Sequence, residues 1–289
     1  MPGVAVVSDT TAYLPPSVVQ ANGISLVSLY VNHGTERTDR EADITDLAGF
    51  FDELRSADQL PTTSQPSVGD FQAAYEPLLA SGSEVVSIHI SAGLSGTCES
   101  ARQAAEALQR QGKGGERVRV VDSATTAGGL GLLALVAARR AAAGDDGEAV
   151  EQTVRAARRE LKIWFAIDTL EFLKRSGRVG AASAWVGSTL KVKPILTVES
   201  EMVPVERVRT SSRAYERMVD YARQRHDSGA DGWVVQHIQA PDQAERLAEE
   251  CTAIFGRDPM FVSELGPVIG VHTGPGLLGV GSIPATLLD

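Results

Sequence analysis

The chain contains little of the chemistry that metal and redox sites need. It has only two cysteines among 289 residues, Cys98 and Cys251, which lie far apart and outside any CxxC motif. They predict neither a zinc site nor a redox pair, and both are interpreted as buried thiols in helical segments. The acidic residues form no paired-carboxylate or D-x-D cluster, which argues against a glycosidase or a divalent-metal enzyme. We therefore expect no metal and no cofactor.

Basic residues are also in the minority. Lys and Arg number 27 against 37 Asp and Glu, which gives a formal net charge of −10. Nucleic-acid binding needs a basic surface and is not expected, and membrane contact is expected to be transient at most. The longest apolar run, Ala127–Ala138, is too short to cross a bilayer, and the first residues do not resemble a signal peptide. These features predict a soluble, cytoplasmic protein.

Aromatic residues make up only 5% of the chain against 43% apolar residues, so the core is expected to be mainly aliphatic. Glycine is abundant, but the segments 128–131 and 274–281 match neither the P-loop pattern nor G-x-G-x-x-G after the first strand. No nucleotide site is predicted. Gly128, Gly129 and Gly131 are interpreted as positions where a helix packs closely on a sheet or on a ligand.

What the first half of the chain does contain is a repeat of strand, polar loop and helix. Apolar strands are predicted at Val4–Val7, Glu84–Ile90 and Arg117–Val121, and each runs into small polar residues. Loops at the carboxyl ends of parallel strands are where α/β proteins bind ligands. The repeat predicts a parallel α/β domain over residues 1–158.

The pattern changes after Leu161. Strands are predicted at Lys191–Val198 and Met202–Arg209, and the three polar residues between them are typical of a hairpin. Further strands and helices lead to a glycine-rich end that contains His272. We predict a second, α+β domain with a mixed sheet over residues 159–289, so the expected fold class is two-domain α/β.

Two local predictions concern the first third of the chain. Ile24–Val31 is expected to form one strand, and Asp43 is expected to cap the next helix. The segment Pro61–Asp70, PTTSQPSVGD, is expected to form a polar loop, with Ser67 and Asp70 as the capping box of the helix that follows. Its hydroxyls and the N–H groups of that helix start suit an anion or a carboxylate.

Ser95 and His272 are the candidate chemical residues. Ser95 lies between a strand and a helix in GLSGT, but the G-x-S-x-G pattern is not met because Thr97 stands in place of the second glycine. A Ser–His–Asp triad with His272 and either Asp9 or Asp122 is one alternative. Ser95 as an oxygen-binding hydroxyl, or simply as a helix cap, is another. His272 in GVHTGPG suits a ligand, a base or a hydrogen-bonded loop residue.

The most basic short run is Lys174–Arg178, KRSGR. It fits a solvated turn at the end of a helix, where cations interact favourably with the helix dipole. It also fits a docking patch for an anion or a protein partner on an otherwise acidic chain.

The sequence resembles the DegV family over essentially its whole length. Eight segments carry the resemblance by their number and order: VVSDTTAYLP, PTTSQPSVGDF, ISAGLSGTCESA, VVDSATTAGGLG, LEFLKRSGRVGAA, LKVKPILTV, VERVRT and GPVIGVHTGPGLLG. One position departs from the family, because Cys98 follows LSGT where the family often has an aromatic residue.

The resemblance implies two domains with a fatty acid buried between or within them. It implies a non-enzymatic subunit that presents the acyl carboxylate to a separate ATP-dependent fatty acid kinase, which forms an acyl phosphate for phospholipid metabolism. The family's carboxylate-binding residues correspond to Thr63, Ser95 and His272. Ser64 and the N–H of Gly96 are their expected neighbours.

An apolar tunnel for the acyl chain follows from the same resemblance, because burying a chain contributes about 0.8 kcal/mol per CH₂. The basic turn corresponds to the kinase-docking region of the family, with Arg175, Arg178 and Arg209 as candidates. The alternative function is an esterase or acyltransferase that uses Ser95 and His272. The aliphatic and small residues expected to line the tunnel are Ile90, Leu94, Ala127, Leu130, Ile167, Ile195 and Ile269.

Overall fold

The structure is a computed structural model that describes residues 3–186 and 192–288. The strands are β1 (Val4–Asp9), β2 (Ser25–Val27), β3 (Tyr30–His33), β4 (Arg37–Arg40), β5 (Thr62–Ser64), β6 (Glu84–His89), β7 (Val118–Asp122), β8 (Lys162–Ala166), β9 (Lys193–Glu199), β10 (Glu201–Val208), β11 (Gly232–His237), β12 (Phe261–Glu264) and β13 (Leu278–Ile283). The helices are α1 (Pro16–Ala21), α2 (Leu47–Ser56), α3 (Val68–Ala80), α4 (Thr97–Arg110), α5 (Ala127–Ala142), α6 (Gly147–Glu160), α7 (Glu171–Arg175), α8 (Ser211–Asp227), α9 (Pro241–Phe255) and α10 (Pro267–Thr273).

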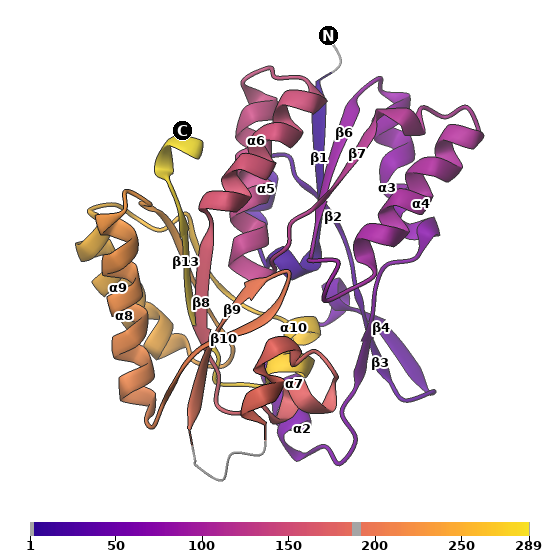
Figure 1. Ribbon diagram of the computed structural model, residues 1–289. Coiled ribbons are helices and arrows are strands. Elements are labelled where there is room, and N and C mark those ends of the chain that lie inside the picture. Colours follow the sequence, from indigo (N-terminus) through magenta and orange to yellow (C-terminus); the bar gives the residue numbers. More distant parts are fainter. Residues whose placement is uncertain (1–2, 187–191, 289) are drawn as a thin grey trace.

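These elements form alternating layers of helix and sheet (Figure 1). In the described residues, β2, β1, β6 and β7 form a parallel sheet in that order, with α3 and α4 on one face and α5 and α6 on the other. Helices on both faces are what an all-parallel sheet requires, since both of its faces are apolar. The predicted parallel α/β layer is confirmed.

A second, mixed sheet lies beyond α5 and α6. Its order in the described part of the chain is β10-β9-β8-β13-β11-β12, and β11 and β12 are its parallel pair. Its outer face is covered by α8 and α9 (Figure 1). The predicted fold class, a parallel sheet plus a mixed sheet, is confirmed. The predicted start of β9, Lys191, lies outside the described residues.

Helix α5 packs against both sheets, and glycines make this close approach feasible. A Cβ atom on Gly128 would lie 2.8 Å from Val234 on the mixed sheet, and one on Gly131 would lie 2.7 Å from Phe261. A side chain at either position would push the mixed sheet away from α5. The interpretation of these glycines as close-packing positions is confirmed. The close packing of α5 brings the mixed sheet to the carboxyl end of the parallel sheet.

The turn between β9 and β10 fixes the mixed sheet to the loops of the parallel one. Ser91 Oγ donates to the carbonyl of Ser200 over 2.5 Å, and Ser200 N donates to the carbonyl of Ala124 over 3.0 Å. Arg158 adds a hydrogen bond of 2.8 Å to Glu199 and one of 2.9 Å to the same Ala124 carbonyl. The predicted domain boundary at residue 158 falls inside α6. This helix lies in the chain between the strands of the parallel sheet and those of the mixed sheet, and the boundary stays a prediction.

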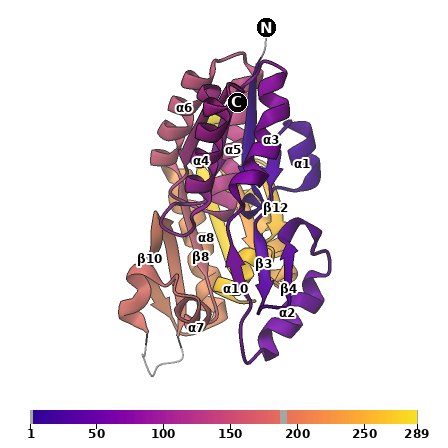
Figure 2. The ribbon, with the colours of Figure 1, turned by 90° about the vertical axis from the view of Figure 1, so that its right-hand side faces the viewer.

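The single strand predicted at Ile24–Val31 is wrong. The chain leaves the parallel sheet after β2 and enters a small antiparallel sheet as β3, with order β4-β3-β5 in the described residues. The break occurs at Ser28 and Leu29, whose hydroxyl and carbonyl accept hydrogen bonds from Ala42 N and Glu41 N. Figure 2 shows this small sheet beside α2 and α10.

Two further local predictions have different outcomes. The cap of α2 is Asp46, which accepts from Gly49 N over 2.9 Å, because Asp43 belongs to a short 3-10 turn instead. The capping box at Ser67 and Asp70 is confirmed, with reciprocal hydrogen bonds of 3.1 and 2.8 Å. Part of the predicted polar loop before it is strand β5, which pairs with β3.

Candidate ligand-binding site

Two adjoining cavities form the candidate site. The polar chamber is lined by β5, the loop before α4, the turn after α7 and α10. The apolar chamber lies between the start of α5 and strands β8, β11 and β13, and its lining is almost entirely apolar. Met202, Ile269 and Thr273 line both chambers, so the two meet there. The site is therefore amphipathic, with one polar end.

All the residues predicted from the sequence to bind a carboxylate line the polar chamber. Thr63, Ser64, Ser95, Gly96 and His272 line it together, although they come from three distant segments. Strand β5 carries the first two, the start of α4 the next two and α10 the last. Hydroxyls and N–H groups converge on one space, as binding of an oxyanion requires.

His272 lies in a short helix rather than in the glycine-rich turn that its sequence predicted. Its imidazole is 9% exposed, and Nε2 lies 2.8 Å from Thr63 Oγ1. Its Nδ1 has no hydrogen-bond partner in the described part of the chain. Burial, and to a lesser extent the positive charge of Arg178, lowers the pKa of His272 to about 4. The imidazole is therefore neutral at pH 7 and offers one donor and one acceptor.

The opposite wall is the start of α4. Gly96 is the N-cap residue of this helix, and Ser95 Oγ lies 2.9 Å from Thr97 Oγ1. A Cβ atom on Gly96 would lie 2.7 Å from Nε2 of Gln65, so glycine lets the Gln65 side chain pack directly on the helix start. The first N–H groups of a helix have no partner within the helix and carry a partial positive charge. Ser95 and α4 thus form the donor-rich side of the chamber.

The geometry of a Ser–His–Asp triad is not formed around His272. Asp9 accepts hydrogen bonds from Thr11 and from the backbone of Ile90, and it lies 3.0 Å from His89. Asp122 accepts from the backbone N–H groups of the loops that follow β6 and β7. Neither carboxylate orients His272, because its Nδ1 is unpartnered among the described residues. A base that lacks an orienting group does not meet the requirement for an activated serine.

A buried network that sequence patterns do not reveal fixes the start of α10. Glu41, which is 5% exposed, accepts hydrogen bonds from Tyr13 over 2.6 Å and from Val268 N over 2.8 Å. Tyr13 in turn accepts from Ile269 N over 3.1 Å, and Thr10 donates to the second oxygen of Glu41 over 2.5 Å. Two orphan N–H groups of α10 are thereby satisfied. This network sets the position of the helix that carries His272.

The residues predicted to line an acyl tunnel divide into two groups. Ile90 and Leu94 line the polar chamber, Ala127 lines the apolar chamber, and Ile269 lines both. Leu130, Ile167 and Ile195 are not part of either lining.

Each of these three exceptions has a structural reason. Leu130 is fully buried among packed side chains of the main core. Ile195 faces the α8–α9 side of the mixed sheet, whereas its neighbour Leu196 faces the other side, as alternation in a strand requires. Ile167 lies past the end of β8 and lines a separate polar cavity beside Lys193.

Several residues of the site were missed by sequence reasoning. Gln65 belongs to the TSQP segment that was singled out, and its position next to Thr63 and Ser64 was the available signal. Met202 was assigned only to a strand, yet it lies where the two chambers meet. Gln236 sits in the fully buried strand β11, and only the packing of that strand against α5 reveals that it faces a cavity.

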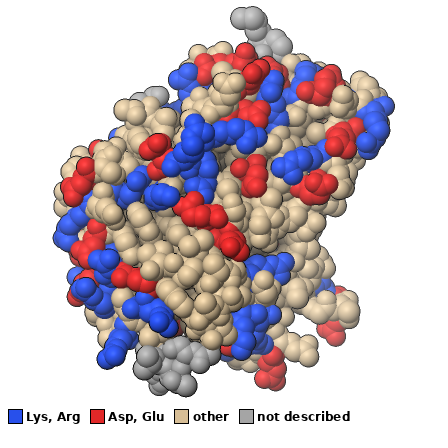
Figure 3. All heavy atoms as spheres, viewed as in Figure 1, with Lys and Arg blue, Asp and Glu red and all other residues tan. Residues whose placement is uncertain are grey.

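The basic turn lies at the outer side of the polar chamber. Arg178 lines both this chamber and a neighbouring surface cavity that also includes Thr63, His272 and Arg175. Arg175 donates to the carbonyl of Asp58 over 2.8 Å. Arg175, Arg178 and Arg209 are all exposed, and basic side chains lie over the position of α7 in Figure 3.

No group of three or more His, Cys, Asp or Glu side chains in residues 3–186 and 192–288 is arranged to hold a metal ion. Over the same residues, no helix combines the length and the apolar character needed to cross a membrane.

The fold and the site define a class: an α/β protein with a parallel sheet, a mixed sheet and an internal cavity that has one polar end and one apolar end. The chain belongs to the DegV family, whose sequence model matches residues 3–285. A DegV domain-containing protein of Streptomyces coelicolor is 40% identical over 285 residues, covering 96% of this chain and 97% of that protein. Protein DegV of Bacillus subtilis is 34% identical over 280 residues, with coverage of 96% and 98%.

Solved structures of the family agree with the fold. A DegV family protein from Thermus thermophilus, described as binding fatty acid, superimposes with a TM-score of 0.86 at 33% identity, covering 98% of this chain and 99% of that one. DegV of Bacillus subtilis, described as a fatty acid binding protein, has the same TM-score and identity and covers 98% and 100%. Both of these DegV family proteins are thus described as binding fatty acid.

Proposed function

We propose that this protein binds a long-chain fatty acid, with the carboxylate in the polar chamber and the acyl chain in the apolar chamber. The observation that carries the proposal is the convergence of Thr63, Ser95 and His272 on one cavity that continues into an apolar one. An internal site with one polar end matches an amphiphile with a single polar group. Burial of the chain contributes about 0.8 kcal/mol per CH₂, which supports tight retention.

The polar chamber suits a carboxylate that must react later. Hydroxyls and N–H groups offset the desolvation of the anion without holding it in a full ion pair. Neutral His272 supplies a further donor through one ring nitrogen. Arg178 lies at the outer side of this chamber and brings positive charge near its entrance.

We further propose that the bound acid is a substrate presented to a separate ATP-dependent kinase. In that reaction a carboxylate oxygen attacks the terminal phosphorus of ATP, and acyl phosphate and ADP are formed. This protein would be the carrier and not the catalyst, which fits the unpartnered Nδ1 of His272. The activity would take place in the cytoplasm, where ATP is available, and would supply phospholipid metabolism.

Native mass spectrometry of freshly purified protein tests the first proposal. We expect co-purified fatty acid, and we expect Ser95→Ala and His272→Ala to bind added fatty acid about tenfold more weakly, since each loses a hydrogen bond to a charged group. Ser17→Ala, at an exposed position of α1, is the control with unchanged binding. A protein that carries no lipid and takes up none would refute the proposal. Covalent labelling of Ser95 by a fluorophosphonate, with ester hydrolysis in the absence of ATP, would favour the esterase alternative.

The docking proposal has its own prediction. Arg175→Ala and Arg209→Ala are expected to reduce acyl phosphate formation by a partner kinase severalfold, because loss of a rim charge mainly slows association. Fatty acid retention should not change, since neither residue lines the polar or the apolar chamber. Arg110→Ala, at the exposed end of α4, is the matched control. Equal rates for all three variants at low ionic strength would contradict docking at this surface.

A further inference from the structure

Three polar side chains line the apolar chamber: Thr126, Gln236 and Thr273. Thr273 donates to the carbonyl of Ile269 over 3.0 Å, so its hydroxyl proton is already used. Thr126 and Gln236 are 4% and 5% exposed, and both line the chamber, from opposite walls. Thr126 precedes α5, and Gln236 comes from β11. A buried polar group in an apolar surrounding is destabilising unless it is hydrogen-bonded. Their presence beside the proposed path of an acyl chain therefore needs a chemical reason.

Thr126 has an unused hydroxyl. It is the N-cap residue of the 16-residue helix α5, but its side chain makes no capping hydrogen bond. Its Oγ1 is buried and has no partner in residues 3–186 and 192–288. The next residue, Ala127, has a φ of 52°, in the left-handed region that an alanine rarely adopts. The N-cap side chain thus leaves the start of α5 uncapped at the edge of the chamber.

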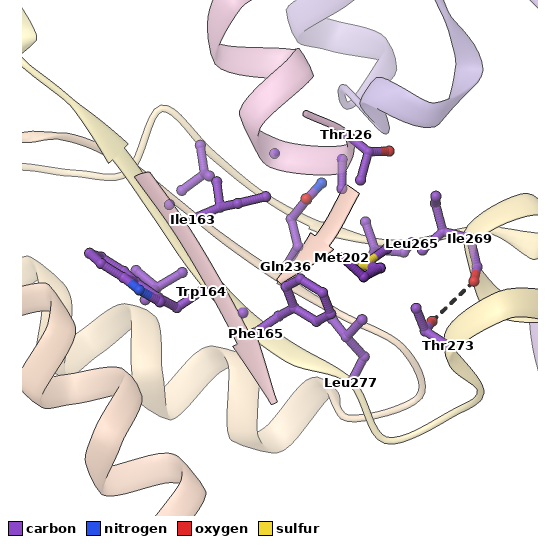
Figure 4. Close-up of a pocket in the computed structure, with 16 residues that line it drawn as sticks. Thr126, Ile163, Trp164, Phe165, Met202, Gln236, Leu265, Ile269, Thr273 and Leu277 are labelled. Atoms are coloured by element: carbon purple, nitrogen blue, oxygen red, sulfur yellow. Dashed lines mark hydrogen bonds between the residues drawn. The ribbon is translucent and has the colours of Figure 1, made fainter. Parts of the chain in front are cut away.

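Gln236 is oriented by a neighbour. Its Nε2 donates to Ser263 Oγ over 2.9 Å, which turns the amide oxygen toward α5. A Cβ atom on Gly128 would lie 2.8 Å from that oxygen, so glycine leaves it room. Figure 4 shows the Gln236 amide directed toward the start of α5, where Thr126 lies. An acceptor from β11 and a hydroxyl from α5 therefore converge.

The chemistry of this pair selects one kind of ligand group. A hydroxyl both donates and accepts, so it can donate to Gln236 Oε1 and accept from Thr126 or from the uncapped start of α5. A ketone only accepts hydrogen bonds and would leave the amide oxygen of Gln236 without a donor. A second carboxylate would need a cation, and no Lys or Arg is among the described residues that line the chamber.

We infer that Thr126 and Gln236 form a subsite for a hydroxyl carried on the acyl chain, so that the protein accepts a monohydroxylated long-chain fatty acid. The inference rests on the proposed function, because it assumes that the acyl chain enters the apolar chamber. A plain chain would place CH₂ groups against the two polar side chains and leave Thr126 Oγ1 and Gln236 Oε1 without a partner from the ligand. A hydroxyl at the matching carbon would satisfy both, whereas a hydroxyl elsewhere on the chain would face an apolar wall.

Competition for delipidated protein tests this inference. Octadecanoic acid and a positional series of its monohydroxylated derivatives are offered in pairs, and bound species are counted by native mass spectrometry. We expect one position, or two adjacent ones, to bind about tenfold more tightly than isomers whose hydroxyl meets the apolar wall. The preferred isomer should also displace the plain acid.

Two substitutions of Thr126 separate the hydroxyl from the shape of the side chain. Thr126→Val keeps the volume and removes the hydroxyl, so the positional preference should fall by about tenfold while plain acid binds at least as well as before. Thr126→Ser keeps the hydroxyl and should keep the preference. Binding of the plain acid to both variants shows that they are folded.

The outcomes distinguish the inference from the proposed function. If wild-type protein binds no octadecanoic acid and none of its derivatives, the proposed function fails. If it binds the plain acid but all isomers bind alike or more weakly than it, only the subsite is overturned. A positional preference that persists unchanged in Thr126→Val would likewise overturn the subsite.

Discussion

Replacing Glu41 by alanine is expected to lower the free energy of unfolding by about 3 kcal/mol or more, because one buried and two half-buried donors lose their acceptor at once. These donors are the hydroxyls of Thr10 and Tyr13 and the backbone N–H of Val268. Thr10 Oγ1 also accepts from Leu29 N over 3.2 Å, so the hydroxyl uses both its donor and an acceptor site. Urea unfolding at pH 7 measures the effect.

Glu41→Gln is a second, milder variant, which keeps the prediction testable if Glu41→Ala fails to fold. Glutamine keeps one acceptor oxygen but offers an NH₂ group where a hydroxyl proton now points, so we expect about half the loss seen with alanine. It also removes a negative charge from the N-terminus of α10, which is unfavourable for the helix dipole. Because α10 carries His272, both variants should bind fatty acid more weakly than wild type.

The control for this pair is Glu36→Ala, an exposed position in the turn between β3 and β4. Its unfolding free energy should stay within about 0.5 kcal/mol of the wild-type value, as is usual for surface substitutions. An equally small change in Glu41→Ala would contradict the role of the network. So would an unchanged fatty acid affinity in a Glu41 variant of clearly lower stability, because α10 would then not depend on the network for its position.

The same network explains why part of the fold could not be predicted from sequence. Ile24–Val31 is apolar except for Ser25 and Ser28, and its pattern alone predicts a single strand. The break at Ser28 and Leu29 depends on hydrogen bonds from residues 41 and 42 and on Thr10, and none of these is close in sequence. By contrast, the parallel sheet was predictable because each strand, loop and helix is encoded within a short local segment.

The site shows a similar division between local and distant signals. Thr63, Ser95 and His272 lie in motifs that could be recognised, and the fold brings all three to one chamber. Gln236 lies in a strand that is buried throughout, where a polar residue is normally interpreted as structural. Its exposure to a cavity follows from Gly128 and the packing of α5 on the mixed sheet, which sequence patterns do not report.

Lowering the pH from 7 to 4 is expected to destabilise the ligand-free protein through His272 by on the order of 3 kcal/mol. Burial, with a smaller effect of Arg178, lowers the pKa of this residue from 6.5 to about 4. Above pH 6.5 the imidazole is neutral in both the folded and the unfolded protein, so it contributes no dependence on pH. Between pH 6.5 and pH 4 only the unfolded protein takes up the proton. Each pH unit of acidification then lowers the free energy of unfolding by about 1.4 kcal/mol. Below pH 4 both states are protonated and the loss levels off.

The comparison with His272→Gln isolates this contribution. Glutamine stays neutral throughout, so titration of the other groups cancels in the difference between the two unfolding free energies measured at each pH. The advantage of wild type over the variant should be constant above pH 7 and should shrink by about 3 kcal/mol on approach to pH 4. A difference that stays flat over this range would show that His272 titrates normally in the folded protein.

Binding of fatty acid should restore part of the unfolding free energy that is lost at low pH. A carboxylate in the polar chamber favours protonated His272 and raises its pKa, so the complex binds more protons than the free protein below pH 6.5. Affinity for the acid should therefore increase as the pH falls from 7 toward 5, and the increase should be absent in His272→Gln. Equal pH dependence in wild type and variant would place the carboxylate away from His272. The hydroxyls of Thr63, Ser64 and Ser95 and the start of α4 would then be its remaining donors in the polar chamber.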